Sequence, residues 1–184
     1  MYDNDEAFDM QQYEQSGENS SGAEFDYEIV NKRMLPLAKQ LIEKYDELKH
    51  IDPEKILFVL NHKAAGSKNR IVLAHTSKIS PLWTELIYQL TSAPKLSYFY
   101  KIEFYARTTN SLDENQMIAL LYSELRRIGP EGKIMTPDVH DWWQLVIGLG
   151  RKWFYPNESC ANLLDDGVDW KKLMGQFYEE IGEE

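Results

Sequence analysis

Cysteine is nearly absent from the sequence, because Cys160 is the single one among 184 residues. One thiol excludes an intrachain disulfide, and it excludes a metal site built from several cysteines, since structural zinc sites need four ligands. A chain without disulfides is typical of a reducing compartment, so we expect a cytoplasmic protein.

Long apolar runs are missing as well. No stretch approaches the roughly 18 apolar residues of a membrane-spanning helix, and residues 1–6 are acidic with no apolar segment behind them. We therefore expect a soluble chain with no signal peptide and no membrane partner. The sequence also lacks a phosphate-binding P-loop, a glycine-rich dinucleotide turn and a recognisable Ser-His-Asp order, which disfavours those enzyme classes.

Basic residues are missing from residues 1–28, which hold nine acids and no lysine or arginine. The last six residues hold four more acids, so residues 29–178 carry 17 acids against 20 bases, or +3, although the whole chain carries −10. Residues 1–25 cannot bury enough apolar surface to offset their ordering entropy, which predicts a disordered, solvating acidic tail. Docking of this tail on a basic partner is the alternative interpretation.

Apolar spacing over residues 26–184 predicts a single domain of the α+β class. Apolar residues recur at helical intervals from Ile29 to residue 49, and Pro36 within this run should kink the helix or mark its start. The other predicted elements are strands at 56–60, 70–76 and 96–106, and helices at 80–90, 113–128, 137–149 and 168–181. This order indicates a small three-stranded sheet packed by helices, with an aromatic turn at 153–156.

The predicted helix 113–128 contains the most anomalous residue. Ser111 and Glu114 have capping-box spacing at its start. At 100° per residue, Glu124 falls inside the apolar arc, between Leu120 and Met117. A carboxylate on a buried face is costly unless it is paired. We expect Glu124 to be buried and paired, with Arg127 as the nearest candidate three residues later.

Three blocks of sequence resemble a known family. Leu121-Tyr122-Ser123-Glu124-Leu125-Arg126-Arg127 stands where a zincin has His-Glu-x-x-His, residues 112–121 look like its lead-in, and Pro137-Asp138-Val139-His140-Asp141-Trp142 is similar to a His-Asp-Val-x-x-Phe pattern. Over about residues 35–155 the chain resembles the Putative phage metallopeptidase family. The resemblance implies a minimal zincin-like domain and a phage, prophage or mobile-element origin.

The metal-ligand positions of this family are changed. The three histidine positions hold Ser123, Arg127 and Pro137, none of which binds zinc usefully, and Arg127 places a permanent cation where the metal would lie. Only the general-base position, Glu124, keeps its residue. We therefore expect no metal and no other cofactor at these positions.

Two other sites are conceivable from the residues. Glu124 with Asp138, His140 and Asp141 would form a carboxylate-rich site for Mg or Mn, although a helix start explains Asp138 equally well and the structural interpretation is favoured. The basic residues of the linker between the first two predicted strands would suit phosphate, although a solvated connection is favoured; they are His62, Lys63, Lys68 and Arg70.

Three functions follow in order of preference. The first is a non-catalytic protein that binds a host or defence-system protein, in the manner of an anti-restriction or anti-CRISPR inhibitor. Its candidate binding residues are Arg127, Asp138, His140 and Asp141, and Glu124 then serves structure. That partner could itself bind nucleic acid, because an acidic tail suits a basic groove. The second is a metal-dependent peptidase or nuclease with Glu124 as its catalytic residue, and the third is a nucleic-acid-binding protein. The sequence does not define the oligomeric state.

Overall fold

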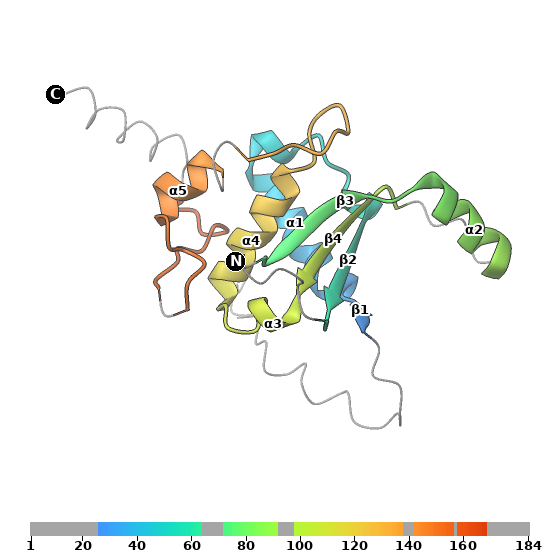
Figure 1. Ribbon diagram of the computed structural model, residues 1–184. Coiled ribbons are helices and arrows are strands. Elements are labelled where there is room, and N and C mark those ends of the chain that lie inside the picture. The colour runs from blue at the N-terminus through green and yellow to red at the C-terminus, as the bar shows by residue number, and fades with distance from the viewer. Residues whose placement is uncertain (1–25, 64–71, 92–97, 138–141, 157, 169–184) are drawn as a thin grey trace, which may run out of the picture.

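The fold was analysed in a computed structural model, which describes residues 26–63, 72–91, 98–137, 142–156 and 158–168 (Figure 1). The predicted acidic tail 1–25 lies outside these residues, as does the predicted last helix 168–181 apart from its first residue. None of the helices within the described ranges combines the length and the apolar content needed to cross a bilayer.

A mixed sheet of four strands lies at the centre of the fold (Figure 1). Its strands are β1 (Tyr27–Ile29), β2 (Ile56–Asn61), β3 (Ala74–Lys78) and β4 (Tyr100–Tyr105), in the order β1-β2-β4-β3. The central pair β2 and β4 is parallel, and both edge strands are antiparallel to their neighbours. The α+β class is thus confirmed, whereas the predicted count of three strands is wrong.

The strand missed by the sequence prediction is β1. We had assigned Ile29 to the start of a helix, but it pairs with Val59 of β2 and remains 69% exposed. Helix α1 (Asn31–Lys44) begins two residues later and runs through Pro36, which therefore does not mark its start. The two short 3-10 helices Asp46–Leu48 and Pro53–Lys55 then connect α1 to β2.

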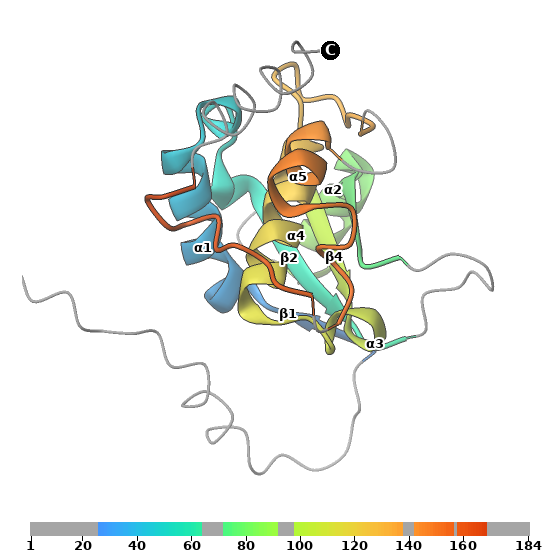
Figure 2. The ribbon, with the colours of Figure 1, turned by 90° about the vertical axis from the view of Figure 1, so that its left-hand side faces the viewer.

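Helices α1 and α4 (Glu114–Arg126) cover one face of the sheet (Figure 2). Strand side chains alternate between the two faces, so every second residue of β2 and β4 points toward these helices. Phe58 and Phe104 are buried there together with Leu121 and Leu125 of α4 and Leu41 of α1. Burial of this apolar core holds α4 against the sheet.

The N-terminus of α4 differs from its prediction. Its capping box uses Asp113 and Gln116, not Ser111 and Glu114: Gln116 N–H donates to Asp113 Oδ1 (2.8 Å), and Asp113 N–H donates to Gln116 Oε1 (2.9 Å). The Gln116 amide also donates to the carbonyls of Trp153 (2.7 Å) and Tyr155 (2.8 Å), in the aromatic turn that the sequence predicted. These distant acceptors fix Gln116 as the residue that completes the cap.

Several of the remaining elements have boundaries that differ from the predicted ones. Strand β3 lies at 74–78 instead of 70–76 because its register is set by pairing with β4, which is itself shorter than predicted. Helix α2 (Pro81–Thr91) matches its prediction, and α3 (Ala106–Thr109) follows β4. Helix α5 (Trp143–Leu149) starts six residues later than predicted, because Trp142 is extended and its indole is fixed to α4.

Candidate functional site

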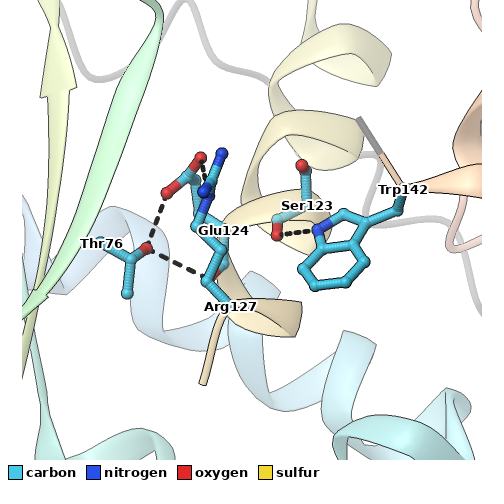
Figure 3. A network of polar contacts seen from close by, with 5 residues as sticks. All are labelled: Thr76, Ser123, Glu124, Arg127 and Trp142. Carbon is cyan, nitrogen blue, oxygen red and sulfur yellow. Dashed lines mark hydrogen bonds and ion pairs between the residues drawn. The ribbon is translucent and has the colours of Figure 1, made fainter. Parts of the chain in front are cut away.

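The candidate site surrounds Glu124, on the side of α4 that faces β3 (Figure 3). Its side chain is 3% exposed, so the predicted burial is confirmed. The hydroxyl of Thr76 on β3 donates to Glu124 Oε2 at 2.7 Å and also lies 3.1 Å from the Glu124 backbone carbonyl. This contact across the sheet–helix boundary satisfies one carboxylate oxygen.

Arg127 satisfies the other carboxylate oxygen. Its Nε atom donates to Glu124 Oε1 at 2.9 Å, within an ion pair three residues apart on the helix. Arg127 ends α4 in helical conformation, and its side chain is 27% exposed. The predicted pairing is confirmed, and the negative charge of Glu124 is balanced by a fixed cation at its side.

The three positions that resemble zinc-ligand positions are Ser123, Arg127 and Pro137, and all three are described by the structure. Ser123 is 5% exposed, and its backbone carbonyl accepts a hydrogen bond from Trp142 Nε1 at 2.7 Å (Figure 3). After α4 the chain turns back at residues 129–133, and the Met135 N–H donates to the Arg127 carbonyl at 2.6 Å. Pro137, two residues after Met135, therefore follows a segment held at the end of α4.

These residues do not fit a zinc ion. Zinc in proteins takes thiolate, imidazole or carboxylate ligands, whereas Ser123 offers a neutral hydroxyl and Pro137 offers no side-chain donor. The Arg127 guanidinium would repel a dication placed beside Glu124. Within the described ranges, no group of three or more His, Cys, Asp or Glu side chains is placed to hold a metal ion.

The other predicted site residues are only partly placed. Asp138, His140 and Asp141 lie outside the described residues, so their predicted approach to Glu124 stays a prediction. Lys68 and Arg70 of the basic linker also lie outside them. His62 and Lys63 are described and directly follow β2, which is distant from α4 in the sequence.

Each of the two described linker bases lies beside an acid of residues 26–28. Lys63 Nζ lies 2.6 Å from Asp26 Oδ2, and His62 Nε2 lies 3.5 Å from Glu28 Oε2. The hydrogen bond and the charge of Asp26 raise the pKa of Lys63. Lys63 and His62 therefore have acidic neighbours within the fold, which makes them less suited to phosphate contact than the sequence predicted.

A second buried carboxylate, Glu103 on β4, escaped the sequence analysis. It is 7% exposed, accepts a hydrogen bond from Asn61 Nδ2 at 2.5 Å, and is paired with Lys101. Burial alone would raise the pKa of Glu103, but the hydrogen bonds from Lys101 and Asn61 and the nearby charge of Lys101 outweigh it and leave that pKa below its ordinary value. Lys101, Glu103 and Tyr105 are spaced two apart in the sequence, and this alternation could have predicted that one face of the strand is polar.

Comparison with known proteins identifies the class to which this α+β domain belongs. The family described as Putative phage metallopeptidase matches residues 25–178. The chain belongs to that family, which confirms the resemblance inferred from the sequence. No curated protein and no solved structure matched the chain.

Proposed function

We propose that this chain is a non-catalytic member of its family, which acts by binding another protein. The observation that carries the proposal is the state of Glu124. Its two carboxylate oxygens accept hydrogen bonds from Thr76 and Arg127, and the residue is only 3% exposed.

Glu124 is poorly arranged for general-base catalysis. A general base must come within hydrogen-bonding distance of the proton that it removes, directly or through one water molecule. Here Arg127 and Thr76 occupy the approaches to the two oxygens, and the residues at the ligand positions do not suit a metal that would activate water. The pair resembles a structural ion pair more than catalytic machinery.

The edge strand β3 offers a binding surface beside this pair. Leu73 O accepts a hydrogen bond from Tyr105 N–H of β4, and Ile79 N–H donates to the carbonyl of Phe99, just before β4. By the alternation of an antiparallel ladder, the backbone groups of Ala74, Thr76 and Lys78 therefore point to the outer edge. No strand of the described chain pairs with that edge. An extended segment of a partner can add to such an edge as a further strand.

The partner that we propose is a host or defence-system protein. A phage family supports this choice, and inhibition of a restriction or CRISPR system is the role that we favour. The seven acids of residues 1–25 suit a partner with a basic, nucleic-acid-binding groove, because opposite charges speed association and favour the correct partner.

Metal content and hydrolysis test the non-catalytic part. Protein purified without chelators should contain far less than one zinc per chain by elemental analysis. It should also fail to hydrolyse peptide or nucleic-acid substrates when Zn, Mg or Mn is added. One tightly bound metal per chain, or turnover abolished by Glu124→Gln in a fully folded sample, would refute this part.

Capture from a phage host tests the binding part. The full chain should retain a specific host protein, and a chain lacking residues 1–25 should retain it more weakly, with the difference shrinking as salt screens the tail. The matched comparison is a tail in which the seven acids of residues 1–25 are replaced by their amides. If the amide-substituted chain captures the host protein as well as the wild type does, the acidic tail does not take part in partner binding.

A further inference from the structure

The guanidinium of Arg127 is only partly used by its ion pair. Its Nε atom donates to Glu124 Oε1 at 2.9 Å, and its two terminal nitrogens make no hydrogen bond or ion pair with any residue that the structure describes. A guanidinium carries N–H donors on all three nitrogens in a planar fork, so most of its donors remain. The side chain is 27% exposed, so part of this group is accessible to a ligand.

The guanidinium is also held in one position. Glu124 pairs with Arg127 and accepts a hydrogen bond from the Thr76 hydroxyl at 2.7 Å, so two consecutive contacts join Arg127 to β3 (Figure 3). A donor that is already fixed loses little side-chain freedom when it binds, which favours affinity. The buried Glu124 therefore acts as a positioning residue for Arg127.

A second base, Lys78, lies at the end of β3 that is closest to Arg127. Its side chain is exposed, makes no ion pair within the described ranges, and shares the face of Thr76 because strand residues two apart point to one side. Lys78 pairs with Tyr100, whose hydroxyl lies 2.9 Å from the position of a Cβ on Gly132, in the turn after α4. This end of β3 therefore lies beside the end of α4, where Arg127 is.

We propose that Arg127 is the receptor for an acidic side chain, aspartate or glutamate, on an extended segment of the partner that pairs with the outer edge of β3. This inference rests on the proposed function, because it specifies the chemistry of the segment that the edge would bind. The backbone groups of Thr76 and Lys78 at that edge bind the main chain of the segment, and the guanidinium binds its carboxylate.

The local charge selects a carboxylate. Among the described groups at this end of β3, Arg127 and Lys78 bring two positive charges and Glu124 brings one negative charge, so one carboxylate balances the remainder. A phosphate would bring up to two negative charges to the end of a helix, where backbone carbonyls already carry partial negative charge. The planar guanidinium also matches the two oxygens of a carboxylate with parallel N–H donors.

An NMR titration of the isotope-labelled full chain tests the inference. The probes are two acetylated and amidated peptides of alternating threonine and valine, with either glutamate or glutamine at the centre. Both should shift the backbone amide signals of Thr76 and Lys78. The glutamate peptide alone should shift the Arg127 Nε–H signal, and it should bind about fivefold more tightly than the glutamine peptide at low salt. This difference should shrink as salt screens the charges.

Variants of the chain separate the two bases. Arg127→Lys keeps a charge beside Glu124 but loses the planar fork, so it should keep the fold and lose most of the preference for the glutamate peptide. Lys78→Gln should reduce that preference without changing thermal unfolding, because its side chain is exposed. The matched control is Lys39→Gln on α1, an exposed base 2.7 Å from Glu54, which should bind both peptides like the wild type.

The outcomes distinguish the receptor from the surface on which it lies. Equal binding of the two peptides, or an Arg127→Lys chain that keeps the full preference for glutamate, would overturn the carboxylate receptor and leave the edge of β3 as a binding surface. If neither peptide shifts the signals of β3, the edge is not a binding surface, and both the receptor and that part of the proposed function are wrong.

Discussion

The Nε atom of Arg127 lies 2.9 Å from Oε1 of Glu124, one turn earlier on the same helix. The guanidinium thus provides a positive charge at a position where this family is expected to hold a metal ligand. It offsets the cost of burying a carboxylate beneath β3. The same contact occupies an oxygen that a general base would need.

Glu124→Gln should therefore destabilise the fold. The amide cannot form the ion pair, and it leaves Arg127 without its charged partner. Since Arg127 is 27% exposed and can regain water, we expect a loss of about 1–3 kcal/mol, below the cost of stranding a fully buried charge. A denaturant titration measures this, and partner binding should fall only as far as the folded fraction falls.

Glu54→Gln is the matched control for that measurement. Glu54 also forms an ion pair, with Lys39 at 2.7 Å, but its side chain is 61% exposed. Exposed pairs contribute little, so this variant should unfold like the wild type. A stable Glu124→Gln protein that has lost all function would contradict the structural role of Glu124.

The sequence predicted the elements whose signals are local. The apolar arc of α4 and the three-residue spacing of Glu124 and Arg127 depend on one helix, and both were predicted correctly. Strand β1 was not predicted, because three residues are too few for a reliable alternation and become a strand only through pairing with β2. Thr76 was missed for a similar reason, since no local pattern reports a contact 48 residues away.

The start of α4 shows how distant contacts decide between equal local patterns. Ser111 with Glu114 and Asp113 with Gln116 both have capping-box spacing, and sequence alone does not separate them. Only Gln116 can also donate to the carbonyls of Trp153 and Tyr155. We expect Gln116→Ala to cost about 2–4 kcal/mol, because it removes part of the cap and leaves the buried Trp153 carbonyl and the partly buried Tyr155 carbonyl without this donor. Chemical denaturation should show a much smaller loss for the exposed Gln89→Ala.

Removal of the first residues should separate the tail from the fold. A chain that begins at Ala23 keeps β1 and should melt like the full chain. A chain that begins at Val30 loses the β1–β2 ladder and the hydrogen bond from His62 N–H to the Asp26 carbonyl (2.9 Å). Its melting temperature should fall by several degrees, at about 2–4 °C per kcal/mol for a chain of this size. Equal melting of both shortened chains would show that β1 adds nothing to stability.

Glu103 should make stability depend on acid pH. Its pKa is lower in the fold than in the unfolded chain, so the unfolded state takes up a proton first as pH falls. The stabilisation is complete above the ordinary glutamate pKa and disappears as pH falls through the lowered value. Unfolding free energies of the wild type measured between pH 6 and pH 3 should therefore decline more steeply than those of Glu103→Gln. Parallel curves would assign the acid sensitivity to other carboxylates.

Histidines at the three positions that resemble zinc-ligand positions should create zinc binding. The triple substitution Ser123→His, Arg127→His and Pro137→His places two imidazoles four residues apart on α4 and a third on the segment that returns to its end. It also removes the guanidinium that would repel the ion. We expect about one zinc per chain by elemental analysis and a melting temperature that rises with added zinc, since a ligand of the folded state stabilises it.

The single variant Ser123→His is the control, because one imidazole beside Arg127 cannot hold zinc at this site. It should bind no stoichiometric metal, and its melting temperature should not respond to zinc. Glu124→Gln added to the triple variant should leave zinc binding intact while removing any hydrolysis that the restored metal brings, since Glu124 is then the only carboxylate beside it. A triple variant that folds but binds no zinc would mean that residues 123, 127 and 137 do not converge on one point. The loss of a metal site would then no longer explain the Glu124–Arg127 pair.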